Sequence, residues 1–157
     1  MPVRIFIHGL ESSNKGTKSV FFKEEFPDMI IPHFTGGLEE RMEKLREILS
    51  SKSGLNLVGS SFGGLMATLF AMEQPGRVKS MVLLAPAINL VKFAPQETKT
   101  ISAPVWLYHG KNDRVVPFSE VEPVAKTLFT NLTLNVVDDD HFLHRTFRGI
   151  DWDALLA

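Results

Sequence analysis

Residues 55–76 read LNLVGSSFGGLMATLFAMEQPG, and this stretch decides the fold. It opens with a short apolar run, Leu55 to Gly59, that is typical of a strand buried on both faces. A helical pattern follows from about Phe62 to Gln74, and Pro75-Gly76 ends it. Only Ser60-Ser61 separates the two patterns, so the chain must turn sharply from strand into helix.

Apolar runs of the same kind recur along the chain and predict five further strands. Most are apolar throughout, which suits a parallel sheet that helices cover on both sides. Between the runs, residues 38–49 carry the stripe of an amphipathic helix, and weaker helical patterns cover 18–26, 119–129 and 146–156. The further strands are expected at 3–7, 29–32, 80–85, 105–109 and 132–137.

This alternation predicts an α/β fold: an open, doubly wound and mostly parallel sheet of about six strands with helices on both faces. The chain has 157 residues, of which 44% are hydrophobic, so we expect a single domain over residues 1–157. Such sheets bind ligands beyond the carboxyl ends of their strands, near the point where the strand order reverses. Functional residues are therefore expected directly after the strands.

The turn within 55–76 has the pattern GxSxG, in which Gly59 and Gly63 flank Ser61. A sharp strand-to-helix turn strains its central residue and needs small residues two positions to either side. Such a nucleophile elbow would raise the Ser61 hydroxyl above the sheet, at a helix N-terminus where the Phe62 N–H favours a developing oxyanion. The alternative for the motif alone is an ordinary strand–helix junction with serine caps.

A serine nucleophile needs a base, and the base needs an acid that orients it. Asp113 lies in the loop after the strand at 105–109, and His141 follows the strand at 132–137. Both therefore lie where the carboxyl edge of the sheet is expected. The chain order Ser61, Asp113, His141 differs from the orders found in chymotrypsin and subtilisin.

The sequence resembles the α/β-hydrolase superfamily in the segments IHGL (7–10), GSSFGG (59–64), HGKNDRVVP (109–117) and DDDHF (138–142). The likeness covers nearly the whole chain, and HGLESSNKGTK (8–18) is similar to small bacterial serine esterases without a lid.

This resemblance implies a catalytic triad of Ser61, Asp113 and His141. It also implies that the backbone N–H of Leu10 is the second oxyanion donor, beside that of Phe62.

The superfamily usually inserts a cap domain after the strand that here ends near residue 85, but the next strand begins near 105. We therefore expect no cap domain and a shallow apolar cleft over the serine. The side chains expected to line this cleft include Phe34, Ile88, Phe93 and Phe142.

The acids that precede His141 raise a metal site as an alternative, because Asp138 to Asp140 and His144 lie close together. No second set of residues with metal-ligand spacing accompanies them, so a solvated acidic loop is the simpler interpretation. We expect neither a metal nor a cofactor. His8 and His109 each precede a glycine at the end of a strand and are expected to position a turn.

The amino-acid composition excludes several further classes of chemistry and of partner. The absence of cysteine excludes disulfides and thiolate catalysis. Seventeen Lys and Arg oppose eighteen Asp and Glu, which argues against a nucleic-acid partner. No apolar run approaches the roughly 20 residues that span a bilayer, and no signal-peptide core is present, so we expect a cytoplasmic protein without a membrane span.

These observations predict a serine hydrolase, first of all a carboxylesterase that cleaves small or short-acyl esters through an acyl-enzyme. A thioesterase or a C–C bond hydrolase would use the same triad. A non-catalytic binding or signalling module on this fold is the alternative from another class. The expected partner is a small-molecule ester, and no oligomeric state is indicated.

Overall fold

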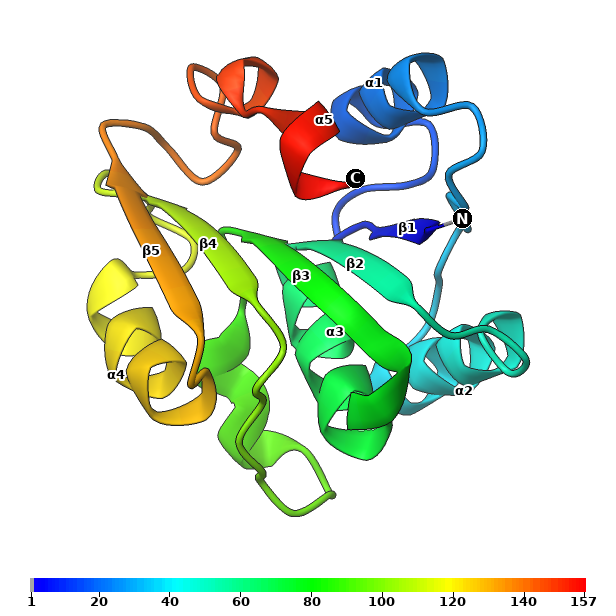
Figure 1. The fold of residues 1–157 in the computed structure, drawn as a ribbon. Helices are drawn as coiled ribbons and strands as arrows, with labels where there is room; N and C mark the ends of the chain where they lie inside the picture. The colour runs from blue at the N-terminus through cyan, green and yellow to red at the C-terminus, as the bar shows by residue number, and fades with distance from the viewer. Residues whose placement is uncertain (1) are drawn as a thin grey trace.

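The computed structural model describes residues 2–157, and its centre is a parallel sheet of five strands (Figure 1). The strands lie side by side in chain order, and every neighbouring pair is parallel. The expected α/β fold with helices on both faces of a parallel sheet is confirmed. The strands are β1 (Val3–Ile7), β2 (Leu55–Ser60), β3 (Val78–Leu84), β4 (Val105–Gly110) and β5 (Leu132–Val137).

The helices form two layers, with α1 and α5 on one face of the sheet and α2, α3 and α4 on the other (Figure 1). Successive strand residues serve opposite layers: Ile5 and Ile7 belong to the core cluster under α2, α3 and α4, whereas Phe6 belongs to the cluster under α1 and α5. The helices are α1 (Thr17–Glu25), α2 (Leu38–Ile48), α3 (Phe62–Glu73), α4 (Phe118–Leu128) and α5 (Trp152–Leu155).

The strand expected at 29–32 is reduced to a single bridge from Ile30 to β1. The Ile30 N–H donates to the Arg4 carbonyl, and the Ile30 carbonyl accepts from the Phe6 N–H, each at 2.9 Å. The next donor in this ladder would be residue 32, but Pro32 has no N–H. The sheet therefore has five strands instead of about six.

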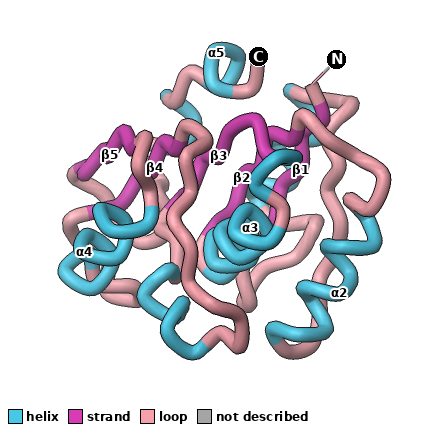
Figure 2. The backbone as a smooth tube through the Cα atoms, turned by 60° about the horizontal axis from the view of Figure 1, so that its bottom comes forward, coloured by secondary structure: helices cyan, strands magenta, loops and turns pink. Residues whose placement is uncertain are grey.

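The strand order reverses at β1, because the Ile30 bridge lies along one edge of β1 and β2 pairs with the other. Helix α3 follows β2 directly and lies between α2 and α4 against the sheet (Figure 2). Every residue from 63 to 72 of α3 is buried, so this helix is apolar all round and fixed by the core. Its first residue stands at the carboxyl edge of the sheet, where the expected site lies.

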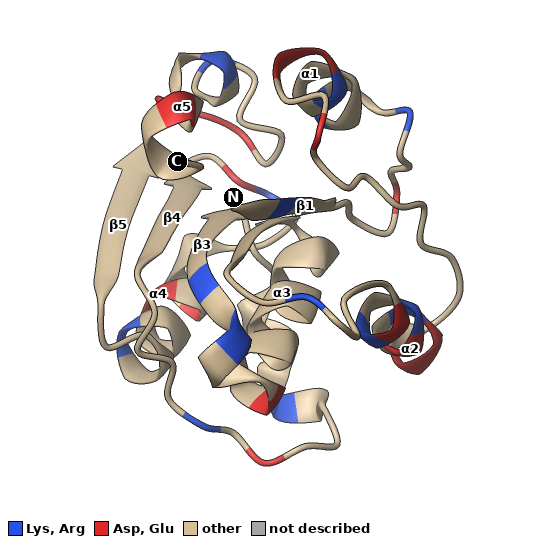
Figure 3. Ribbon diagram, turned by 45° about the vertical axis from the view of Figure 1, so that its right-hand side comes forward, with Lys and Arg blue, Asp and Glu red and all other residues tan. Residues whose placement is uncertain are grey.

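Between β3 and β4 the chain forms only a short 3₁₀ turn, η2 (Ile88–Phe93), and loop, so no cap domain covers this edge within residues 2–157. The strands contain two charged residues, Arg4 and Lys79, each the second residue of its strand. Charge near the carboxyl edge therefore comes from loops and helices (Figure 3). None of the helices formed by residues 2–157 is both long enough and apolar enough to cross a membrane.

Candidate active site

Ser61 occupies the turn between β2 and α3. Its backbone has φ 54° and ψ −116°, a conformation that non-glycine residues rarely adopt. The Ser61 N–H donates to the Leu84 carbonyl, and its own carbonyl accepts from the N–H groups of Gly64 and Ala87, all at 2.9 Å. These three bonds fix the strained turn to the end of β3, to the loop that follows β3 and to the first turn of α3.

Gly59 and Gly63 provide the space that this turn needs. A Cβ atom on Gly59 would overlap the carbonyl group of Gly63, and one on Gly63 would overlap the carbonyl group of Ile7. The start of α3 therefore packs directly against the backbone of β1. Both glycines lie where the elbow motif predicted close backbone contact.

His141 joins the other two predicted residues in one hydrogen-bonded chain. Its Nε2 lies 3.1 Å from the Ser61 Oγ, and its Nδ1 lies 2.7 Å from the Asp113 Oδ2. Asp113 is in the loop after β4, and His141 is in the loop after β5. The structure thus brings together side chains that are far apart in sequence, because the carboxyl ends of parallel strands meet at one edge.

Asp113 is enclosed by hydrogen-bond donors, and its side chain has no exposed surface. Its Oδ1 accepts from the N–H groups of Val115 and Val116, at 2.9 and 2.8 Å. These bonds leave Oδ2 directed toward His141, which fixes the imidazole ring.

His109 is a further neighbour of Asp113. Its Nε2 lies 2.7 Å from the Val116 carbonyl and 3.3 Å from the Asp113 Oδ2. Because a carbonyl only accepts, this nitrogen carries the ring proton, and burial lowers the pKa of His109. The HG pattern predicted that His109 positions a turn, but the sequence did not indicate its contact with the acid.

The predicted oxyanion donors lie on either side of Ser61. Phe62 is the first residue of α3, and Leu10 follows Gly9 in the loop after β1. An ideal Cβ atom on Gly9 would lie 3.2 Å from the Ser61 Cβ and 3.8 Å from the Phe62 nitrogen, so this loop runs beside the serine. Neither the Leu10 nor the Phe62 N–H donates to another backbone group among the described residues.

His8 fixes the direction of the loop that carries Leu10. Its Nδ1 donates to the Gly9 carbonyl at 2.7 Å, and its Nε2 accepts from the Phe34 N–H at 2.9 Å. The Gly9 carbonyl and the Leu10 N–H belong to one planar peptide unit and point in opposite directions. His8 therefore orients the Leu10 N–H, and it does so as a neutral ring, whose pKa burial lowers.

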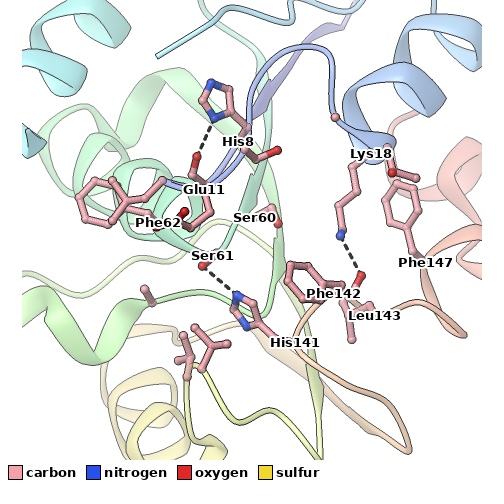
Figure 4. A pocket seen from close by; sticks show the side chains of 18 of the residues that line it. His8, Glu11, Lys18, Ser60, Ser61, Phe62, His141, Phe142, Leu143 and Phe147 are labelled. Carbon is pink, nitrogen blue, oxygen red and sulfur yellow. Dashed lines mark hydrogen bonds between the residues drawn. The ribbon is translucent and has the colours of Figure 1, made fainter. Parts of the chain in front are cut away.

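A cavity of about 730 Å³ opens beside Ser61 and His141 (Figure 4). Its rim includes Leu10, Val115 and Phe142, each more than half exposed. Ala87, Asn89 and Leu90 also line the cavity, as do residues of α1 and of the segment that follows His141. An apolar cavity next to a polar hydrogen-bonded chain is the usual form of a small-molecule site.

The cleft lining differs from the expectation at three of four residues. Phe142 lines the cavity, but Phe34 and Ile88 are buried in the core cluster under α2, α3 and α4. Phe93 is largely exposed and is not part of the cavity wall. Ile88 is the first residue of η2 and is buried, and the Phe34 N–H donates to the His8 ring.

The acidic segment before His141 organises its own loop. The Asp139 carboxylate accepts from the N–H groups of Asp140, Arg145 and Thr146, at 2.8 to 2.9 Å. Burial alone would raise the pKa of Asp139, but these donors outweigh it and lower the pKa. Asp139 is thus buried and structural, so the solvated-loop interpretation was wrong for this residue. Residues 2–157 contain no group of three His, Asp or Glu that is placed to hold a metal ion.

Comparisons with known proteins agree with this architecture. A family model described as alpha/beta hydrolase fold matches residues 12–103. A putative hydrolase from Xanthomonas campestris has a similar structure, with a TM-score of 0.77 and 24% identity over 94% of this chain and 91% of that chain. Est1E from Butyrivibrio proteoclasticus, solved with ferulic acid bound, has a TM-score of 0.76 and 17% identity over 99% and 86%.

An esterase from Pyrococcus furiosus is also similar, with a TM-score of 0.67 and 17% identity over 98% of this chain and 78% of that chain. At these identities the likeness concerns the fold. A comparison with curated protein sequences gave no match.

Proposed function

Since the chain belongs to the family of alpha/beta hydrolases, we propose that it is a serine hydrolase, and more narrowly a carboxylesterase that cleaves small or short-acyl esters. One observation carries the proposal: His141 lies 3.1 Å from the Ser61 hydroxyl and 2.7 Å from the Asp113 carboxylate. These are the contacts that a general base needs in order to take a proton from a serine and remain oriented while charged.

In the proposed acylation step, the Ser61 Oγ attacks the acyl carbon of the ester while His141 Nε2 takes the serine proton. The developing oxyanion accepts hydrogen bonds from the N–H groups of Leu10 and Phe62. The C–O bond of the ester then breaks, and His141 returns the proton to the leaving alcohol. Asp113 keeps the imidazole in the productive tautomer and stabilises its charged form.

In the proposed deacylation step, water takes the place of the alcohol. His141 removes a proton from the water as it attacks the acyl carbon, and the proton passes to Ser61 as the acid leaves. The open cavity beside Ser61 gives water access to the acyl-enzyme.

A fluorophosphonate probe tests the assignment, because it reacts covalently with an activated serine. The wild type should be labelled and should hydrolyse p-nitrophenyl acetate. Ser61→Ala should lose labelling and lose turnover by a factor on the order of 10⁴ or more. Ser60→Ala is the matched control and should still be labelled. Persistent labelling of Ser61→Ala would disprove the nucleophile, and an unlabelled, inactive wild type would disprove the hydrolase.

A further inference from the structure

The cavity beside Ser61 ends in two cationic side chains, Lys18 and Arg148, which we call its cationic end. Lys18 is in the first turn of α1, and Arg148 is in the 3₁₀ turn η3 (Phe147–Gly149). The fold brings them together because α1 and the C-terminal segment cover the same face of the sheet. Figure 4 shows Lys18 on the same side of Ser61 as Phe142 and Phe147.

The Lys18 ammonium is half-buried and only partly satisfied. Its Nζ donates to the Phe142 carbonyl at 2.8 Å and lies 5.4 Å from the centre of the Phe147 ring. An ammonium has three N–H donors, so this contact leaves two available. The Arg148 guanidinium lies 5.5 Å from the centre of the Phe21 ring. Across residues 2–157, neither cation forms a salt bridge.

The acids nearest to Lys18 are already engaged. Asp139 accepts from three backbone N–H groups of its own loop, and Asp140 binds the His144 ring at 2.6 Å. Burial lowers the pKa of Lys18, and the charges of Asp140 and Asp139 only partly oppose this effect. Among the described residues that line the cavity, Glu11 is the one carboxylate, and it is exposed. The cationic end therefore holds two cations that no carboxylate of the described residues pairs with directly.

Resting on the proposed ester hydrolysis, we propose that the substrate carries a carboxylate. This carboxylate lies on the arm of the ester, its acyl group or its alcohol group, that extends toward the cationic end. The free N–H donors of Lys18 and Arg148 would bind this carboxylate. The rest of the arm would pack against the rings of Phe142 and Phe147. Such a pair is stronger than an exposed one, because the half-buried ammonium is poorly screened by solvent.

Two matched pairs of esters test the proposal, one for the alcohol arm and one for the acyl arm of the substrate. In the first pair the leaving group differs: 4-acetoxybenzoate carries a carboxylate, and 4-acetoxybenzamide is neutral. In the second pair the acyl group differs: phenyl hydrogen glutarate is anionic, and its primary amide is neutral. In at least one pair, kcat/KM for the anionic ester should exceed that for the neutral ester by about tenfold, and added salt should reduce this ratio.

Variants then assign the preference to the cationic end. Lys18→Met and Arg148→Met should each lower the anionic-to-neutral ratio. Lys18→Gln should do the same, although it keeps an N–H donor for the Phe142 carbonyl. Lys23→Met, which removes an exposed lysine elsewhere on α1, is the control and should keep the ratio. Arg148 is exposed, so its variant remains informative if the Lys18 variants fold poorly.

Three results would overturn the inference: no preference for the anionic ester in either pair, a preference that survives the Lys18 and Arg148 variants, or an equal loss of activity on both esters of a pair. The last result would mean that Lys18 only holds the Phe142 carbonyl beside His141. All three require hydrolysis of the neutral esters, so they are distinct from failure of the proposed function, in which no ester is cleaved.

Discussion

An amide at position 113 cannot replace the Asp113 carboxylate without changing the tautomer of His141. In Asp113→Asn, the side-chain oxygen would face the N–H groups of Val115 and Val116, which leaves the amide NH₂ toward His141. His141 Nδ1 would then have to accept a hydrogen bond, so the ring proton would move to Nε2. A protonated Nε2 cannot take the proton of the Ser61 hydroxyl. We expect kcat to fall by a factor on the order of 10⁴ with little change in KM.

Steady-state kinetics on p-nitrophenyl acetate measures this effect. Asp138→Asn is the matched control, because its exposed carboxylate lies outside the His141 contacts, and it should keep most of the activity. If Asp138 were essential and Asp113 dispensable, the proposed orienting acid would be wrong.

His8 should make the stability of the fold depend on pH. Burial lowers the pKa of His8 in the folded chain, whereas a histidine in the unfolded chain has a pKa of about 6.5. The unfolded chain therefore binds the proton first, and the free energy of unfolding falls as pH drops below about 6.5 toward the folded-state pKa. This one residue contributes at most about 1.4 kcal/mol per pH unit.

Urea unfolding of the wild type and of His8→Asn between pH 8 and 5 checks this prediction. The variant should lose less stability over this range, because it has no proton to take up at position 8. His109, whose pKa is also lowered by burial, is present in both chains and is part of the common background. Equal pH slopes for the two chains would contradict the role given to His8.

At the scale of elements, the loop after β5 depends on one carboxylate. Asp139→Asn would lose the charge that binds the N–H groups of Asp140, Arg145 and Thr146, and should lower the free energy of unfolding by about 1–3 kcal/mol at pH 7. The pKa of Asp139 is lowered on folding, so its contribution is present above the unfolded pKa of about 3.9 and is lost as pH falls through the folded value.

The comparison with wild type in urea at pH 7 and at pH 3 tests both parts of this prediction. The difference between the two chains should be clear at pH 7 and should shrink at pH 3. Asp138→Asn, in which an exposed carboxylate is changed, should alter stability by less than about 0.5 kcal/mol. A difference that is the same at both pH values would mean that shape, not charge, matters at position 139.

The elements were predictable where local pattern and tertiary packing agree. The apolar strands and α3, which is apolar except for Thr68 and Glu73, need burial wherever they lie, so their sequence shows them directly. The predicted helix at 146–156 was wrong in extent: Ile150 is extended, Asp151 accepts from the Ala154 N–H, and the segment divides into η3 and α5. Its apolar residues face the core from two short turns, and their spacing imitates a single helix.

The candidate site was predictable to the same degree. The positions of Ser61, Asp113 and His141 follow from strand ends, because a parallel sheet gathers those ends whatever the side chains do. The cavity wall depends instead on which way a loop side chain turns. Ile88 is buried in the core, and Lys18 of α1 contacts the Phe142 carbonyl; neither placement can be read from a local sequence pattern.

At the scale of the whole molecule, the acyl chain should be limited in length because residues 2–157 form no cap over the cavity. Each methylene gains about 0.8 kcal/mol only while it is buried, so the gain should stop where the chain leaves the cavity. We expect kcat/KM for p-nitrophenyl esters to peak at short chains between acetyl and palmitoyl. Since the described part of the chain forms no lid over Ser61, emulsified substrate should cause no jump in rate. A maximum at long chains, or strong interfacial activation, would contradict this prediction.

The separation of the proposed base from the proposed nucleophile makes ester turnover a reporter of folding. Ser61 and His141 are 80 positions apart, and His141 is carried by the edge strand β5. A form in which β5 has detached would separate the His141 ring from the Ser61 hydroxyl and should be silent in the assay. A chain in which β5 has not yet docked would likewise lack the contact between Ser61 and His141, so the proposed activity should appear only after this strand joins the sheet.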